Sequence, residues 1–294
     1  MDLNWLDDVL VLLEEGNMTR AAERRNITQP AFSRRIRSFE DWLGKPILDR
    51  RSNRVEIGAS LASNEAEIRA LVARIREMRT NIANYEADRT DVTIAAQHAS
   101  ICSSFPDMAL RARHAFPNLR IRLRAGNLDD CISVFLRGDA SLFLCYAAEG
   151  TRQMDFGAGV KQGIWGSDYL VPVVGGGLRY TVNANSTLSA DTPAVVYPEE
   201  SYFGQVLKRG GRAFSTPSFT DNPVCVTAFS SGTLELVLKG IGIGWLPYSM
   251  AHREIASGNL VSLASALGQE SLSVLVFADR ATPAATALLD FWGS

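Results

Sequence analysis

The alternation of apolar and polar positions predicts a short amphipathic helix near the start of the chain. In the stretch NITQPAFSRRIRSFEDWLG, Phe32, Ile36 and Phe39 recur at helical spacing and define one buried face. Thr28 stands before them as a suitable N-cap. Pro30 is compatible with the first turn, where the backbone N–H groups have no partner inside the helix. We therefore expect a helix that starts at about Gln29 and packs through its apolar stripe.

The opposite face of this helix carries donors. Ser33, Arg34 and Arg37 lie there, and Gln29 stands at the exposed tip. Such a face has two interpretations. It is either an ordinary solvated surface or a surface that offers amide, hydroxyl and guanidinium groups to base edges in the major groove of duplex DNA. A preceding short helix over 18–25, with a small Ala-Ala pair that admits a close neighbour, favours the second interpretation.

An arginine-rich turn follows the helix. The segment RSNRVEI (51–57) reads as two short strand-like pieces around a turn, and it carries Arg51 and Arg54. We interpret it as a wing that reaches backbone phosphates or the minor groove. Together, the two helices and the wing predict a DNA-binding module.

A long stretch without proline or glycine comes next, from Ala59 to about Ala87. Apolar residues at heptad spacing run along it, interrupted by the polar Asn64, and they predict a dimerisation seam between two helices. The alternative is a single helix packed on its own domain. Two copies joined in this way would present two recognition helices to a two-fold operator. The seam residues are Leu61, Ile68, Leu71, Ile75, Met78 and Ile82.

From residue 90 the pattern changes to strands that alternate with helices. TDVTIAAQ, LRIRLRAG and SLFLCY read as strands with helices between them, and a second unit starts at about Ser167. This alternation predicts two α/β lobes around mostly parallel sheet. Small-molecule sites form at the carboxyl ends of such strands and between lobes.

The charge distribution sharpens this organisation. The 294-residue chain carries a net charge of −2. The stretch from Arg20 to Arg54 has ten basic and four acidic residues, a net charge of +6, so the remainder carries −8. A basic module on an acidic body favours a polyanionic partner for the module alone.

Several classes of protein are excluded by the same composition. No apolar run approaches the length of a membrane span, and the acidic start MDLNWLDDVL does not resemble a signal peptide, so we expect a cytoplasmic protein. Four dispersed cysteines and three distant histidines predict neither a disulfide framework nor a metal site, and no cofactor is expected. The chain has no GxSxG, Walker or HExxH motif, and we do not expect an enzyme.

The segment TRAAERRNITQPAFSRRIRSFEDWLGKPILDR resembles the winged DNA-binding domain of the LysR-type transcriptional regulators. The resemblance rests on the Ala-Ala pair, Thr-Gln-Pro-Ala, Ser-Arg, Glu40, Leu-Gly and Arg50. It implies that Gln29, Pro30, Ser33 and Arg34 face the bases. The sequence departs from the family where IGASL replaces Leu-Thr-x-x-Gly, so we expect a displaced start of the next helix.

The resemblance extends over PDMALRARHAFPNLRIRL and LVLKGIGIGWLP to the effector-binding domain of that family, which has a periplasmic-binding-protein-like fold. It implies that three loops face an interlobe cleft and hold a small polar or anionic effector at helix N-termini. Ala99 and Leu128 depart from the polar residues of many relatives, and Ser201 and Ser230 have the alternative role of helix caps. The effector-binding candidates are Gln97, His98, Ser100, Ser201, Tyr202, Ser230 and Ser231.

The segments SYFGQ and GIGWLPYSMAHREIASGNLV also resemble the hypochlorite-responsive branch of the family. This likeness leaves open a redox-sensing regulator that responds to oxidants through cysteine or methionine oxidation. We take Cys102 and Cys145 as the redox candidates, because the pattern places one in the first turn of a helix and the other at a strand end near the cleft.

The sequence thus predicts an α/β regulator in three parts. Residues 1–58 form a winged helix–turn–helix DNA-binding domain, 59–89 a linker and dimerisation helix, and 90–294 a two-lobed effector-binding domain. The expected function is sequence-specific DNA binding that a small effector modulates, with operator DNA and a second copy as partners. The resemblance implies a homodimer or a homotetramer.

Overall fold

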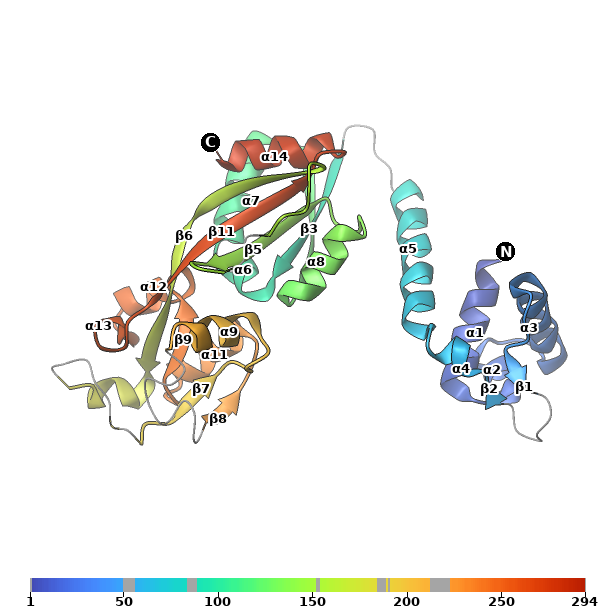
Figure 1. Cartoon of the computed structure of the whole chain (residues 1–294), viewed down its shortest axis with the longest axis horizontal. Coiled ribbons are helices and arrows are strands. Elements are labelled where there is room, and N and C mark those ends of the chain that lie inside the picture. Colours follow the sequence, from blue (N-terminus) through green and yellow to red (C-terminus); the bar gives the residue numbers. More distant parts are fainter. Residues whose placement is uncertain are drawn as a thin grey trace. The chain divides into compact units, whose positions relative to one another are not determined.

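The computed structural model describes residues 2–49, 56–83, 89–151, 154–183, 189, 191–211 and 223–293 (Figure 1). The chain divides into two compact units, residues 1–87 and 88–294. Among the described residues, no helix is both long and apolar enough to span a membrane. Arg51 and Arg54, the predicted wing arginines, lie outside the described residues.

The first unit is a helical module with a small two-stranded sheet. Its helices begin where capping residues satisfy exposed N–H groups: the Asp2 and Asn17 side chains accept hydrogen bonds from the first turns of α1 and α2. Thr28 stands at the N-cap of α3, as predicted, but its side chain makes no capping hydrogen bond. The elements are α1 (Leu3–Glu15), α2 (Met18–Arg24), α3 (Gln29–Leu43), β1 (Leu48–Asp49), β2 (Glu56–Ile57), α4 (Ala59–Ala62) and α5 (Glu65–Ala83).

The predicted apolar stripe of α3 forms the centre of this module. Phe32, Ile36 and Phe39 are at most 3% exposed, and they pack with the buried Ala21 and Ala22 of α2. The small alanines let α2 approach α3 closely. The helix–turn–helix pattern in the sequence is therefore confirmed as a packed unit.

The stretch after the wing differs from the prediction of one uninterrupted helix. The chain leaves helical geometry at Ser63–Asn64, between α4 and α5. Leu61 is only 5% exposed and belongs to the core of the first unit, so its assignment to the dimer seam is wrong. It packs on its own domain because the short α4 directs it inward. Ile68 also packs against this core.

The second half of α5 keeps the exposed apolar face that a seam requires. Leu71, Met78 and Ile82 are 47%, 54% and 69% exposed, and Ile75 is half-buried. The two alternatives for this stretch therefore apply to different parts of it. Its beginning packs on its own unit, and its later turns keep an apolar stripe exposed among the residues that the structure describes.

The second unit contains two lobes joined by long strands. In the first lobe, α7 and α14 cover one face of a sheet and α8 covers the other (Figure 1). Its elements are β3 (Thr90–Gln97), α6 (His98–Cys102), α7 (Phe105–Ala115), β4 (Leu119–Gly126), α8 (Leu128–Leu136), β5 (Leu142–Ala148), β11 (Glu270–Asp279) and α14 (Pro283–Gly293).

The strand β6 (Val160–Gly175) passes from the first lobe into the second (Figure 1). In the second lobe it pairs with β9 and β10. The other elements of that lobe are η1 (Gly176–Thr181), β7 (Ala194–Val196), α9 (Tyr202–Arg209), β8 (Pro223–Val226), α11 (Ser230–Leu238), β9 (Gly244–Pro247), α12 (Tyr248–Ala256), β10 (Leu260–Ser262) and α13 (Ala264–Leu267).

The sheet is mixed, which corrects the expectation of mostly parallel strands. Strand order is β10-β6-β11-β5-β3-β4, with β9 also paired to β6. Only the β3–β4, β3–β5 and β7–β8 pairs are parallel among the described strands. The reason is that β6 and β11 pair along their lengths in opposite directions. Helix–strand alternation signals the parallel pairs but not these long returning strands.

Candidate functional sites

The exposed face of α3 is the first candidate site. Gln29, Pro30, Arg34 and Arg37 are exposed and Ser33 is half-buried, while the opposite face fills the core. The structure therefore places all five predicted α3 residues away from the buried stripe, on a face open to a partner.

Ion pairs separate the arginines of this module into two groups. Arg25 donates to Oδ1 of the fully buried Asp8 at 2.5 Å, and Arg35 lies 3.4 Å from Oδ2 of the same carboxylate. Arg20 and Arg24 pair with Glu15 on α1. These four arginines fasten the three helices to one another.

Arg34 and Arg37 have no ion pair or hydrogen bond with any described residue. Their guanidinium groups project from a helix whose own packing does not use them. They remain available to an anionic or hydrogen-bonding partner, which is the arrangement that nucleic-acid recognition needs.

Glu40 connects α3 to the start of the wing. Its buried carboxylate accepts hydrogen bonds from the backbone N–H groups of Ile47 and Leu48, at 2.9 and 3.3 Å. The strand β1 is thereby held against the C-terminal half of α3. The acidic residue that contributes to the family resemblance thus has a positioning role in this chain.

The second candidate site, here called the interlobe cluster, consists of the seven predicted effector residues. His98 on α6 contacts the Phe229 ring, which directly precedes α11, with ring centroids 4.8 Å apart. Tyr202 on α9 accepts a hydrogen bond from the Ala148 N–H at the end of β5, at 2.8 Å. Both contacts join the first lobe to the second. The three loops predicted to converge are therefore linked through their neighbours.

Most polar side chains of the interlobe cluster are already hydrogen-bonded inside the protein. Gln97 accepts from the Tyr146 N–H at 2.7 Å, and the fully buried Ser100 donates to the Gln97 carbonyl at 2.8 Å. Ser201 accepts from the Gly204 N–H at 3.2 Å, so it caps α9, as its alternative interpretation proposed. Ser230 does not act as a side-chain cap, because its hydroxyl lies 2.7 Å from the Tyr197 hydroxyl.

Gly204 explains why α9 can start so close to the preceding turn. A Cβ atom at this position would lie 2.0 Å from the Pro198 carbonyl oxygen, which no real side chain tolerates. The glycine therefore lets the Ser201 cap and the start of α9 press against the Pro198 turn. His98 and the exposed Ser231 remain as cluster side chains without a hydrogen bond to a described residue.

Tyrosines that the sequence pattern missed form the interior of this region. The Phe203 ring lies between Tyr146 and Tyr197, with centroid distances of 5.7 and 5.4 Å. Burial raises the pKa of both phenols, and it raises the pKa of Tyr202 to about 12. For Tyr146 and Tyr197, the only sequence signal was that each ends or follows an apolar strand. This signal predicts burial rather than a site.

A buried carboxylate joins β5, β6 and the start of α12. Asp168 accepts hydrogen bonds from the Tyr146 hydroxyl at 2.9 Å, the Ser249 hydroxyl at 2.5 Å and the Ser249 N–H at 3.1 Å. Ser103 extends this network, with its hydroxyl 2.6 Å from that of Tyr146. The network crosses from the first lobe into the second and satisfies the buried charge.

The thiols give no support to the redox alternative. Cys145 lies in the middle of β5 and is fully buried, not at a strand end beside the cluster as predicted, and burial raises its pKa well above the ordinary value. Burial also raises the pKa of Cys131 to about 11, which suppresses the reactive thiolate. Cys102 is exposed at the last residue of α6. Among the described residues, no cluster of ligating side chains forms a metal site.

Comparison with known proteins agrees with both units. Residues 3–59 match the bacterial regulatory helix-turn-helix protein, lysR family, and residues 86–293 match the LysR substrate binding domain. The HTH-type transcriptional regulator YjiE of Escherichia coli (strain K12) is 26% identical over 267 residues, which cover 90% of this chain and 84% of that protein.

Solved structures show the same fold over the full length. Vibrio fischeri DarR in complex with DNA superimposes with a TM-score of 0.64 at 23% identity, covering 100% of this chain and 99% of that one. HypT from Salmonella typhimurium, a hypochlorite-specific LysR-type regulator, gives 0.60 at 21% identity, covering 99% and 96%. With two family models that together cover nearly the whole sequence, this chain belongs to the LysR family and is a DNA-binding transcriptional regulator with an effector-binding domain.

Proposed function

We propose that α3 reads base edges in the major groove through Gln29, Ser33 and Arg34, with Arg37 beside them. The observation that supports this assignment is the contrast among the arginines. Arg20, Arg25 and Arg35 are paired with carboxylates of α1, whereas Arg34 and Arg37 have no partner among the described residues. Arginine pairs with two acceptors on guanine, and glutamine pairs with adenine in the same way.

Substitution of Arg34 tests this proposal. An operator is first selected from random duplexes with the wild-type protein, and affinities for it and for random DNA are measured at one salt concentration. Arg34→Ala should weaken specific binding by about 10- to 100-fold and non-specific binding far less, because one base contact contributes roughly 1–3 kcal/mol of discrimination.

The matched control is Arg20→Ala, which removes an exposed arginine of α2 that pairs with Glu15. It should leave the ratio of specific to non-specific affinity unchanged. An equal loss on both DNAs for Arg34→Ala would instead assign this side chain to phosphates.

The wing arginines Arg51 and Arg54 are proposed to bind backbone phosphates. This assignment rests on the sequence and on the short β1–β2 pair that flanks their segment. Replacement of both by alanine should reduce the slope of log affinity against log salt by up to about two units, one for each phosphate that the protein no longer neutralises. An unchanged slope in the folded double variant would rule out this role.

We further propose that the exposed side of α5 pairs with a second copy of the chain. Leu71, Met78 and Ile82 leave an apolar stripe that monomers rarely expose. The stripe continues into a groove of about 570 Å³, which Leu71 lines together with Trp42 and Leu43 at the end of α3. Apolar residues at heptad spacing fit a helix of the same kind, so the occupant we propose is α5 of another copy.

Sedimentation of a charged variant tests the pairing. Met78→Glu should shift the protein toward monomers, because a buried unpaired charge is costly. Thr80→Glu, on the opposite side of α5, is the control and should leave the assembly unchanged. The wild-type run also distinguishes the two alternatives, a dimer and a tetramer. A Met78→Glu variant that assembles like the wild type would place the interface elsewhere.

For the second unit we propose that a small polar or anionic effector binds at the interlobe cluster and modulates DNA binding. The starts of α9 and α11 both contribute to the cluster, and helix N-termini favour negative charge. None of the seven cluster side chains is a carboxylate. The chemistry therefore suits a carboxylate, phosphate or sulfate group better than a cation.

Thermal unfolding of the full-length protein against a panel of small carboxylates, phosphate and sulfate tests this proposal. A ligand that binds only the folded state stabilises it by mass action, by about 2.7 kcal/mol at a hundred times its dissociation constant. This stabilisation raises the unfolding temperature. His98→Ala and Ser231→Ala should reduce the shift. His252→Ala, an exposed histidine on α12, should not. An equal reduction by all three variants would rule out the cluster.

A further inference from the structure

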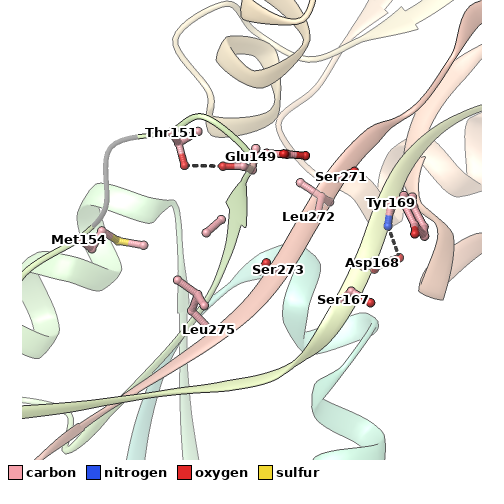
Figure 2. Close-up of a pocket in the computed structure, with 12 residues that line it drawn as sticks. Glu149, Thr151, Met154, Ser167, Asp168, Tyr169, Ser271, Leu272, Ser273 and Leu275 are labelled. Atoms are coloured by element: carbon pink, nitrogen blue, oxygen red, sulfur yellow. Dashed lines mark hydrogen bonds between the residues drawn. The ribbon is translucent and has the colours of Figure 1, made fainter.

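A groove on the outer side of the second unit has no part in the function proposed above. It has a volume of about 400 Å³ and lies over β5, β11 and β6 (Figure 2). These strands reach the border between the lobes, and β6 continues into the second lobe. The residues that line it are Ala147, Ala148, Glu149, Thr151, Met154, Ser167, Asp168, Tyr169, Ser271, Leu272, Ser273 and Leu275.

Strand register places the polar groups of this groove in two adjacent rows. Ser273 on β11 stands opposite Ala147 on one side and Ser167 on the other. Two residues along, Ser271 stands opposite Tyr169, and its carbonyl accepts a hydrogen bond from the Glu149 N–H. Directly opposed side chains on one sheet face lie about 5 Å apart, so the three serines form a compact set of hydroxyls.

Among the described residues, one carboxylate supplies the charge that faces the groove. Glu149 is exposed at the rim, and it makes no side-chain hydrogen bond or ion pair with any described residue. In Figure 2 its carboxylate extends toward Ser271. Asp168, by contrast, is directed away from the groove and is satisfied by Tyr146 and Ser249. No lysine or arginine is among the described residues that line the groove.

The remaining lining is apolar. Met154 and Leu275 lie on the same side of the groove in Figure 2, and Ala147 also lines the groove. An occupant therefore meets a hydrophobic surface at one end and hydroxyls with a single negative charge at the other. One carboxylate among neutral hydroxyls is too few charged ligands for a divalent cation, but it matches an ammonium group, which offers three donors.

We propose that this groove binds a small organic ammonium compound, with its ammonium group on Glu149 and the hydroxyls of Ser271, Ser273 and Ser167, and its apolar body over Leu275 and Met154. The volume fits a molecule at the small end of the ligand range. None of the groove residues is one of the seven residues of the interlobe cluster. The groove is proposed to bind a cation, whereas the cluster is proposed to bind an anion. The proposal therefore stands independently of the anion-binding role proposed for that cluster.

Calorimetric titration of the full-length protein with tyramine tests the proposal, because tyramine joins an ammonium group to one aromatic ring. 3-(4-Hydroxyphenyl)propionate carries a carboxylate in place of the ammonium group, and 4-ethylphenol carries neither. We expect saturable binding of tyramine, at least about tenfold weaker binding of 4-ethylphenol and no displacement of bound tyramine by the carboxylate, because one charge-assisted hydrogen bond contributes about this much to binding.

Variants locate the binding. Glu149→Gln should weaken the binding of tyramine by about tenfold. It should leave the fold intact, since the side chain is exposed. Glu235→Gln, the same change at an exposed position on α11, should have no effect. Ser273→Leu should abolish binding by filling the middle of the groove. His98→Ala should leave tyramine affinity unchanged, because that residue belongs to the interlobe cluster.

Four results would overturn the proposal. They are the absence of saturable tyramine binding by the wild type, displacement of tyramine by the carboxylate analogue as readily as by tyramine itself, unchanged affinity in Glu149→Gln, and loss of binding in His98→Ala. The last result would move the amine to the interlobe cluster. Failure of anions to bind that cluster would not affect any of these outcomes.

Discussion

The α3 surface and the interlobe cluster use polar side chains in opposite ways. On α3, Arg34 and Arg37 are left without partners in the described chain, while the arginines around them fasten the module together. In the interlobe cluster, Gln97, Ser100 and Ser201 already make internal hydrogen bonds.

The difference fits the two kinds of partner that we propose, duplex DNA for α3 and a small effector for the interlobe cluster. Duplex DNA presents a repeated, fixed surface, so a rigid helix with unused donors can read it directly. A small effector has few groups, and a pocket side chain that is already satisfied contributes little net energy to it. The effector site that we propose would therefore rely on the backbone N–H groups at the starts of α9 and α11, and on His98 and Ser231.

The largest expected effect on stability breaks the ion pairs that hold the DNA-binding module. Asp8→Asn removes the charge that Arg25 and Arg35 share at a fully buried position. We expect the first unit to lose about 2 kcal/mol, below the cost of breaking a fully buried pair, because both arginines can rehydrate. Hydrogen exchange of the amides of α1 to α3 measures this loss. Unchanged exchange would mean that the paired arginines do not fasten the helices.

The next effect removes one internal hydrogen bond from the interlobe cluster. Tyr197→Phe leaves the buried Ser230 hydroxyl without its partner at 2.7 Å. An unsatisfied buried hydroxyl costs about 1–2 kcal/mol, and the loss should fall on the second unit alone. Urea unfolding followed by exchange in α11 and β7 measures it. If Tyr197→Phe left the free energy of unfolding unchanged, the hydrogen bonds inside the cluster would contribute less to stability than the comparison with α3 requires.

A smaller effect is expected where the cluster residue acts as a helix cap. Ser201→Ala should cost the second unit about 1 kcal/mol in the absence of any ligand, because the Gly204 N–H loses its acceptor. Ser201→Asp should restore most of this stability, since aspartate also caps helices. The same melting temperature for wild type and Ser201→Ala would show that the hydroxyl is free for an effector after all.

The smallest stability effect is expected on the DNA-facing surface. Arg34→Ala should change the free energy of unfolding by less than about 0.5 kcal/mol, although it strongly weakens specific DNA binding, because the side chain has no described partner to lose. A melting curve of the same preparation used for the DNA measurements checks this. A marked loss of stability in Arg34→Ala would mean that this side chain also makes contacts within the protein, as the polar side chains of the interlobe cluster do.

The sequence by itself determined which face of α3 is buried in the DNA-binding module. Helical spacing identified Phe32, Ile36 and Phe39 as the buried stripe, and the residues between them then had to face outward. This inference works because an α-helix of one module obeys a single period, so burial on one face determines exposure on the other. The sequence also separated strands from helices in the second unit.

Other features depended on contacts between distant segments. Heptad spacing counted Leu61 as a seam residue, but a break at Ser63–Asn64 directs it into the module core. No local pattern showed that Asp8 would face Arg25 and Arg35 from another helix.

The same holds within the effector-binding unit. The tertiary structure decided that Ser230 bonds to Tyr197, that Cys145 is buried in mid-strand, and that β6 and β11 return antiparallel. The spacing of apolar residues along the sequence indicates which side of a helix or strand a residue occupies. Only the packed chain decides what stands opposite that side, because the partners come from segments far apart in sequence, and their approach is set by the fold as a whole.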